Sequence, residues 1–281
     1  MDPFGTPNFQ RTSSTRSKEV VRPGSSRETI SMSGVDAVQS GIAVLVLLGI
    51  TIITSSVARV RIRADVLIAL ARGAVQMVAI ALVIGWVFRH PEGVAVYLGV
   101  MLVAASITSA RRIRCGMPLA PLLGLAIAAG AACAVIPVLA SGALQMQSET
   151  IVPFSAQIIG GSMTAASLTG VRLRDDVGRD WGQVEAWLSL GATPRQAVAD
   201  FGRVAAGRAL IPAIDQTRSA GLVTLPGAFV GLLLGGASPG EAAEVQLLVL
   251  AGLLAAETVA AVLTARALAT WLGTTRPATI I

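Results

Sequence analysis

The sequence predicts an all-α membrane protein, a bundle of transmembrane helices, and both composition and run length support that class. Of the 281 residues, 53% are hydrophobic and only 14% are charged, whereas a soluble domain carries about a quarter charged residues. The stretch 117–148 contains no charged residue, and about 20 apolar residues suffice for a helix to cross a bilayer. Its apolar residues are continuous rather than alternating, which argues against membrane β-strands.

Seven segments have the length and apolarity of a membrane span. They are residues 38–58, 65–88, 93–110, 118–140, 151–171, 217–236 and 242–268. Residues 1–35 are rich in Ser, Thr, Arg, Pro and Gly and lack the apolar core of a signal peptide, so we expect a disordered tail there. We expect a transmembrane domain over 36–272, with a helix-turn-helix at 176–208, and a short cytoplasmic tail over 273–281.

The arginine residues predict how the chain is oriented in the membrane. They gather after the first, third and fifth spans, whereas the loops 141–150 and 237–241 hold no Lys or Arg. Positively charged short loops stay in the cytoplasm, which places the N-terminus outside and the C-terminus inside. The N-terminal tail conflicts with this orientation, because it also holds Lys18 and four Arg residues. A start at Met32 would remove the conflict.

The polar stretch after the fifth span contains strong signals for a helix, a sharp turn and a second helix. Residues 181–190 form the expected first helix, and Gly191 can take the left-handed conformation that ends it. Thr193 is the expected N-cap of the second helix and Pro194 its first residue, while Gln196 completes a capping box with Thr193. All of these residues are predicted to lie on the cytoplasmic side.

Three runs in and after this stretch carry a family resemblance. They are LSLGATP at Leu188–Pro194, LIPAID at Leu210–Asp215 and GLVTLPG at Gly221–Gly227. Together they resemble the FetB-type iron-export permeases, a family that also includes plant permeases associated with aluminium tolerance. The resemblance extends over about residues 40–270. It includes the further matches Glu185-Ala186-x-x-x-x-Gly191, Arg72-x-x-x-Gln76, Ser238-Pro239 and Gln246.

The resemblance implies a membrane-spanning permease subunit of an ABC transporter, a multi-pass protein of the cell inner (plasma) membrane that exports metal ions such as iron. It also implies a separate ATP-binding cassette subunit, which carries the ATP and Mg. Because about seven spans are fewer than a full ABC transporter core usually has, we expect a homodimer that binds two copies of this subunit. In that family the cytoplasmic loop docks in a cleft of the ATPase, and Trp187 and Leu188 are expected to be exposed on its apolar face. The coupling residues implied are Glu185, Trp187, Leu188, Gly191, Thr193 and Pro194.

Several chemistries lack the residues that they require. A P-loop needs a lysine beside its glycines, and the only lysine is Lys18 in the tail, so we expect no enzyme activity and no cofactor bound by this chain. The same absence excludes a retinal Schiff base in the membrane. His90 is the only histidine and the cysteines Cys115 and Cys133 stand alone, so metal-binding residues are unknown. The arginines are too scattered for a nucleic-acid interface.

Polar residues at membrane depth are the candidates for a translocation pathway, because such residues are costly there and often functional. They are Arg72, Gln76, Gln157, Asp215, Arg218 and Glu257. Some of them could instead have a structural role. Arg72 could pair with Asp215 or Glu257 inside the bundle, and Asp215 could pair with Arg218 at i, i+3 at the membrane interface. For Glu257, a pathway role and a structural role are equally open.

Three functional classes remain open at this point. The first is the ABC permease driven by a separate ATPase. The second is an ion-coupled secondary transporter that uses Glu257, Asp215 and Arg72 as a relay. The third is a membrane scaffold without transport. The glycines Gly227, Gly231 and Gly235 share one helix face, which predicts close helix packing within one subunit or a dimer interface.

Overall fold

The computed structural model describes residues 34–59 and 63–276, and within these ranges the regular structure is helical. The helices are α1 (Gly34–Val57), α2 (Arg63–Val87), α3 (Gly93–Ile113), the short η1 (Met117–Leu119), α4 (Ala120–Ala140), α5 (Ser148–Arg179), α6 (Trp181–Ser189), α7 (Pro194–Ser219), α8 (Gly227–Leu234) and α9 (Pro239–Thr274). Six of them, α1 to α5 and α9, are long and apolar enough to cross a membrane. The all-α membrane class is therefore confirmed.

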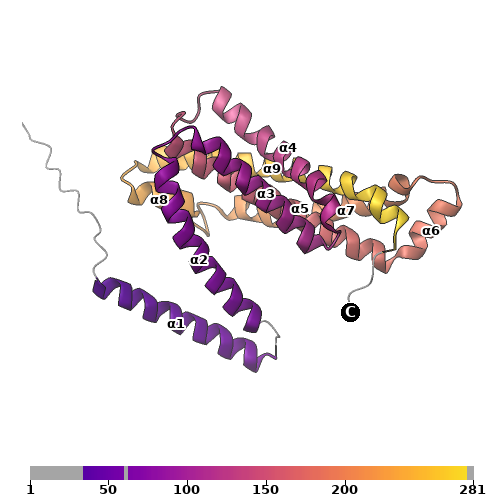
Figure 1. Ribbon diagram of the computed structural model, residues 1–281, viewed down its shortest axis with the longest axis horizontal. Helices are drawn as coiled ribbons and strands as arrows, with labels where there is room; N and C mark the ends of the chain where they lie inside the picture. The colour runs from indigo at the N-terminus through magenta and orange to yellow at the C-terminus, as the bar shows by residue number, and fades with distance from the viewer. Residues whose placement is uncertain (1–33, 60–62, 277–281) are drawn as a thin grey trace, which may run out of the picture. The chain divides into compact units, whose positions relative to one another are not determined.

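The chain divides into two compact units, and the boundary falls inside α2. The first unit ends at Val75 and contains α1 and the beginning of α2. The second unit begins at Gln76 and contains the remaining helices, with α6 at one end and α8 at the other (Figure 1). Most of the expected tail 1–35, and residues 277–281 of the expected C-terminal tail, lie outside the described residues.

In the second unit α3 and α5 run in the same direction. The hydroxyl of Ser109 on α3 lies 2.9 Å from that of Ser167 on α5. Ile113 lies four residues further along α3, and its carbonyl oxygen accepts a hydrogen bond from the guanidinium of Arg174 on α5 over 2.8 Å. Arg174 is buried, and its positive charge lies at the C-terminal end of α3, where the helix dipole favours a cation.

Helices α5 and α9 also run parallel, and glycines bring them close together. A Cβ atom added to Gly252 of α9 would lie 3.1 Å from Ile158 of α5. Further along both helices, a Cβ on Gly161 would lie 2.6 Å from Leu253, and one on Gly170 would lie 3.1 Å from Leu268. Because both residue numbers rise together, the C-terminal ends of α5 and α9 lie at the same end of the unit.

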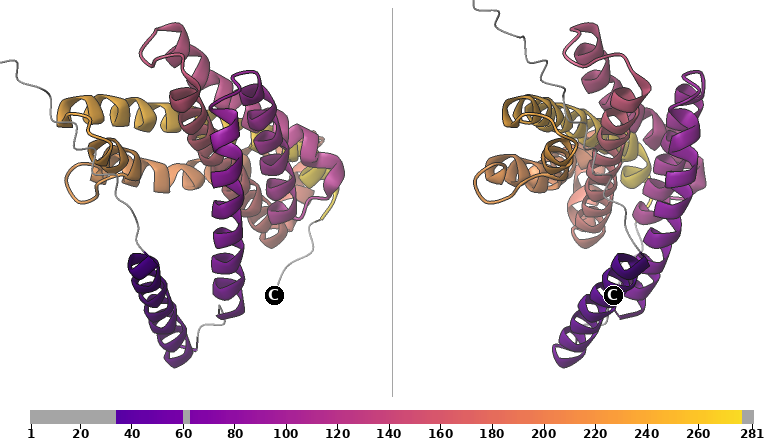
Figure 2. Two further views of the ribbon diagram at one scale, coloured as in Figure 1. Left: turned by 60° about the vertical axis from the view of Figure 1, so that its left-hand side comes forward. Right: turned by 90° about the vertical axis from the view of Figure 1, so that its left-hand side faces the viewer.

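Helix α7, which follows α5 and precedes α9 in the chain, runs in the opposite direction to both. It lies side by side with α9 (Figure 2). Its first residue, Pro194, contacts Gly273 near the end of α9, and Gly202 faces Ala265 one level further in. Since α5 and α9 are parallel spans, the chain between them has to return across the membrane. Helix α7, with 26 residues, is about 39 Å long and can make that return.

The expected span over 217–236 is wrong. Helix α7 ends at Ser219, a turn follows, and α8 contains only eight residues, about 12 Å of helix against a hydrocarbon core of about 30 Å. Gly221 and Gly236, on either side of α8, have positive φ angles of 80° and 92°. This apolar segment forms the bend between α7 and α9, and α7 is the helix between α5 and α9 that is long enough for a return crossing.

The other expected spans agree with the observed helices to within a few residues, with one further exception. Helix α5 continues to Arg179, eight residues beyond its expected end at position 171. Its added turns carry charged residues and pack against α6 and α7 outside the apolar part of the helix. Helix α9 likewise extends to Thr274, so the expected tail over 273–281 begins within a helix.

Helix α8 is held at the beginning of α9. The buried Gln246 of α9 accepts a hydrogen bond from the backbone N–H of Phe229 over 3.2 Å. Ser238 is the N-cap of α9, and Glu241 completes its capping box, so the turn before α9 is fixed by its own side chains. These contacts join α7, α8 and α9 into one hairpin.

We predict that the two ends of α7 lie on opposite sides of the membrane. In a background with Cys115→Ala and Cys133→Ala, Gln183→Cys on α6 and Leu222→Cys in the turn after α7 would each be labelled with a membrane-impermeant maleimide. Both native residues are exposed, so each new thiol should react, but from opposite faces of oriented vesicles. Met146→Cys, in the exposed turn before α5, serves as the reference and should label together with Leu222→Cys. Labelling of Gln183→Cys and Leu222→Cys from one face would contradict the crossing.

We predict that Gly130→Ala destabilises the bundle. A Cβ at Gly130 of α4 would lie 2.5 Å from the carbonyl oxygen of Ala256 on α9, a backbone atom that cannot move aside. We expect a loss of about 1–3 kcal/mol, measured as a lower thermal midpoint in detergent. Gly160→Ala is the matched control, because nothing lies within 4 Å of its Cβ position; an equal loss there would contradict the packing argument.

Candidate functional site

The connection between α6 and α7 is a sharp elbow whose turn requires a glycine. We define the elbow as residues 181–197, from the start of α6 to the first turn of α7. Gly191 has φ +88°, the left-handed conformation that was predicted. The N–H of Ala192 bonds to the carbonyl of Trp187 and that of Gly191 to the carbonyl of Leu188, both over 3.0 Å. This pair of bonds is the Schellman pattern that ends helices at a left-handed glycine.

The start of α7 is fixed by the predicted capping box. The backbone N–H of Gln196 donates to the Thr193 hydroxyl over 3.4 Å, and the Thr193 N–H donates to the Gln196 amide oxygen over 2.8 Å. Pro194 is the first residue of the helix, where its missing N–H and fixed φ angle do no harm. Both halves of the elbow are therefore set by local interactions, as the sequence predicted.

The elbow exposes two large apolar side chains and anchors itself by others. Trp187 is 47% exposed and Leu190 is 80% exposed, whereas Val184 is fully buried in a cluster with residues of α5, α7 and α9. The expectation that Leu188 is exposed was only partly right, since it packs against the same buried cluster. Glu185 does not point freely outward either, because its carboxylate accepts a hydrogen bond from the Trp181 indole over 2.7 Å.

The elbow rests directly on the last turns of α9. A Cβ on Gly273 would lie 2.5 Å from the carbonyl oxygen of Pro194 and 2.7 Å from its Cβ, so the two backbones are in contact. The buried cluster beneath includes Leu268 and Leu272 of α9 and Val198 of α7. The elbow therefore contacts α9 directly and continues into α7 without an intervening loop.

Helix α7 carries an exposed stripe of charges. We define the stripe as Asp200, Arg203, Arg208, Asp215 and Arg218, which lie on less than half of the helix circumference at about 100° per residue. The 18 positions from the first to the last span about 27 Å, less than the hydrocarbon core of about 30 Å. In an α7 that crosses the membrane, some of these charges would lie at membrane depth, where facing lipid is unfavourable, and the stripe would have to face water or protein.

One of the proposed pathway residues, Glu257, lies where α5 meets α9. A Cβ on Gly161 would lie 2.8 Å from a carboxylate oxygen of Glu257, so the glycine makes room for this side chain. Gln157 lies one helical turn before Gly161 on α5 and is exposed. Glu257 forms no ion pair with any residue in the described ranges, which keeps both of its sequence-based interpretations open.

The remaining pathway candidates lie elsewhere. Asp215 and Arg218 form an exposed ion pair of 3.8 Å at the end of α7, in the i, i+3 geometry considered from the sequence. Arg72 and Gln76 are one turn apart on α2, on either side of the boundary between the two units. Their role, and the pairing of Arg72 with Asp215 or Glu257, stay predictions. Among the described residues, no three His, Cys, Asp or Glu side chains are grouped to hold a metal ion.

The sequence interpretation missed the first three members of the stripe on α7. Asp200, Arg203 and Arg208 were assigned to a cytoplasmic segment because the crossing was expected after residue 216. The buried face of α7 consists mostly of Ala and Gly, for example Gly202, Ala206 and Ala209, which give a weak hydropathy signal. The small-residue spacing was the signal that could have identified α7 as a packed helix.

Comparisons with known proteins agree with this architecture. A family model described as "Uncharacterised protein family (UPF0014)" matches residues 38–271. The rice (Oryza sativa subsp. japonica) "UPF0014 membrane protein STAR2" is 33% identical over 224 residues, which cover 79% of each chain. "Protein ALUMINUM SENSITIVE 3" of Arabidopsis thaliana is 29% identical over 222 residues, 78% of this chain and 81% of that protein.

A bacterial relative carries a functional name. The "Probable iron export permease protein FetB" of Escherichia coli (strain K12) is 28% identical over 207 residues, which cover 73% of this chain and 80% of that protein. No solved structure matches the chain. Because the family model covers more than half of the chain and a relative shares 33% identity over four-fifths of both lengths, this chain belongs to the UPF0014 family of multi-pass membrane proteins.

Proposed function

We propose that this chain is the permease subunit of an ABC transporter and that it is driven by a separate ATP-binding subunit. The observation that carries the proposal is the elbow. Its turn is fixed by Gly191 and Thr193, it exposes Trp187 and Leu190, and it rests on α9 through Pro194. Exposed aromatic and aliphatic side chains on a rigid turn are the anchors expected of a protein docking site.

The elbow lies at the end of the unit where positive charge gathers. Helices α3 and α5 end there with their arginines, among them Arg111, Arg112 and Arg174. Such charge marks the cytoplasmic side, which supports the proposed orientation with the N-terminus outside and the C-terminus inside. A cytoplasmic ATPase would then reach the elbow directly.

The stripe on α7 supports a homodimer with two ATPase subunits. With six apolar spans and α7 as a further crossing, one chain has fewer membrane helices than the core of an ABC transporter usually contains. Two copies that face one another would place their stripes against a shared aqueous space or against each other, away from lipid. In this arrangement the candidate pathway includes the stripe together with Gln157, Glu257, Arg72 and Gln76.

Energy would enter this assembly as a rigid-body movement. ATP binding would draw the ATPase subunits together and displace the two elbows, and the contact between Pro194 and Gly273 would carry the displacement into α7 and α9. The transported substrate is proposed from a relative alone: the name of the E. coli protein specifies iron export. ATP and Mg would be held by the partner subunit.

A second candidate function is an ion-coupled secondary transporter. The observation that favours it is Glu257, a partly buried carboxylate at membrane depth without an ion-pair partner among the described residues. Such groups often belong to proton or ion relays. In this alternative Glu257, Asp215 and Arg72 would carry the coupling ion, and the elbow would have no docking role.

We predict that changes at the elbow abolish association with the ATP-binding subunit. Trp187→Glu with Leu190→Glu would put charge on the exposed apolar anchors, and Gly191→Arg would add bulk at the turn and force an arginine into the left-handed conformation at a cost of about 1–2 kcal/mol. Both variants should insert normally and elute as the wild type in detergent, but the ATPase should no longer co-purify. Leu222→Glu, equally exposed at the opposite end, is the control. Unchanged co-purification of the elbow variants would contradict the proposal.

We predict that transport requires the partner's ATPase activity. Proteoliposomes holding both subunits should move ferrous iron when ATP is supplied on the side of the elbow, and vesicles holding this chain alone should not. An ATPase subunit that binds but cannot hydrolyse ATP is the control. Transport by this chain alone, driven by an ion gradient and lost in Glu257→Gln, would favour the secondary transporter instead.

A further inference from the structure

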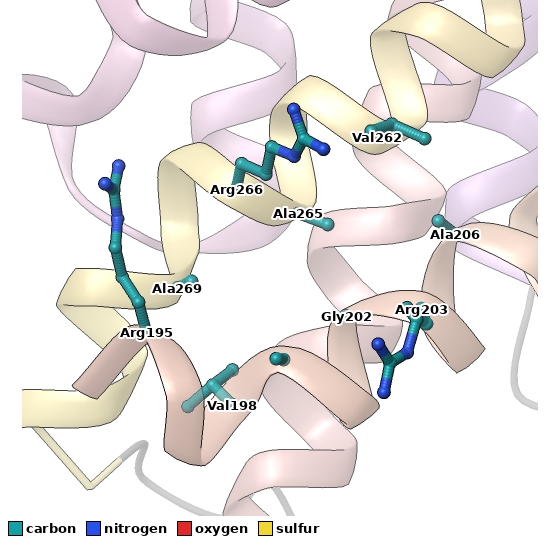
Figure 3. A pocket seen from close by; sticks show the side chains of 10 residues that line it. Arg195, Val198, Gly202, Arg203, Ala206, Val262, Ala265, Arg266 and Ala269 are labelled. Carbon is teal, nitrogen blue, oxygen red and sulfur yellow. The ribbon is translucent and has the colours of Figure 1, made fainter. Parts of the chain in front are cut away.

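A groove between α7 and α9 has two chemically distinct parts. It has a volume of about 490 Å³, and its floor consists of small and aliphatic side chains from both helices (Figure 3). The floor residues are Val198, Ala199, Gly202, Ala206, Val262, Ala265 and Ala269. Arginines line the same groove, two from α7 (Arg195 and Arg203) and one from α9 (Arg266).

The groove has an excess of positive charge. Arg203 forms an ion pair with Asp200 on the same helix. Within the described ranges, Arg195 and Arg266 form no ion pair. Arginine is suited to phosphate because its planar guanidinium can donate two parallel hydrogen bonds. Two guanidinium groups from different helices, both lining this groove, therefore provide phosphate donors on each side of it.

The groove also lies near the level where the apolar parts of α3 and α5 end. Ala265 and Ala269 bracket Leu268, the α9 residue that faces Gly170 of α5. Gly170 also faces Ile113, the last residue of α3, so this level is where the apolar part of the bundle ends. A phosphate bound by the arginines would be at the membrane surface, and the apolar floor would continue toward the hydrocarbon core.

We propose that this groove binds the phosphate headgroup of an anionic phospholipid from the cytoplasmic leaflet. The arginines would hold the phosphate and the alanine-rich floor would receive the first part of an acyl chain. A free phosphate would use only the arginines and leave the floor empty, and an acidic protein segment would not fill an apolar floor. A bound lipid would link α7 to α9 beside the elbow, a role separate from docking of the ATPase.

The test uses the full chain without any ATPase, so its result does not depend on the proposed transport function. Purified protein would be titrated with phosphatidylglycerol or phosphatidylcholine, and bound lipid counted by native mass spectrometry. We expect phosphatidylglycerol to bind more tightly. Arg195→Gln with Arg266→Gln should weaken that binding about thirtyfold, equivalent to about 2 kcal/mol for two arginines, and Arg195→Lys with Arg266→Lys should weaken it less.

The control is Arg111→Gln with Arg112→Gln, which removes the same charge from exposed positions at the end of α3 and should leave the binding unchanged. Equal weakening in this control would overturn the proposal, because it would indicate general surface attraction. Displacement of the lipid by millimolar inorganic phosphate would overturn it in favour of a free-anion site. If the groove variant instead binds lipid normally, or loses self-association while lipid binding persists, the groove is not a lipid site.

Discussion

The parallel contact between α5 and α9 is the constraint on which the rest of the second unit depends. It is possible because glycines stand at the crossing points: a Cβ on Gly161 or Gly170 would lie within 2.6 Å of a side chain on a neighbouring helix. Lipid supplies no hydrophobic drive between helices, so close packing of small residues has to hold them together. Two parallel spans joined by one chain also require a return crossing, and α7 is the helix that we predict to make it despite its charges.

Helix α7 would be a poor membrane helix by itself. A single arginine at the centre of a lone helix costs about 2.5–3.5 kcal/mol on insertion scales, and α7 carries several charged residues. Its other face is buried Ala and Gly against α5 and α9, and Arg208 reaches Asp176 of α5 over 3.4 Å. Its stability in the bilayer thus comes from its neighbours, and α9, joined to it through α8, supplies the apolar surface that α7 lacks.

Local structure could be predicted from the sequence far better than the path of the chain. The elbow followed from residues that act on their immediate neighbours: a glycine for the left-handed turn, and Thr193 with Gln196 for the cap. The return crossing could not be predicted in this way, because hydropathy measures whether a segment tolerates lipid, and α7 packs one face against α5 and α9 and carries charges on the other. Leu188 was misjudged for a related reason, since its burial depends on side chains of α5, α7 and α9 that are distant in sequence.

The same geometry determines what a load on the elbow would do. Helix α7 starts within the elbow and its first residue touches α9, whereas α5 is tied to α3 by Arg174 and Ser109. A force on the elbow would therefore move α7 and α9 relative to α3 and α5. A rigid helix of about 39 Å that tilts by about 10° moves its far end by about 7 Å, roughly the width of a hydrated ion. That movement would also load the contacts between α5 and α9, where Leu253 packs on Gly161 and Ile158 packs on Gly252. Under the proposed function, the glycine contacts that hold α9 against α5 would thus also limit how α9 moves.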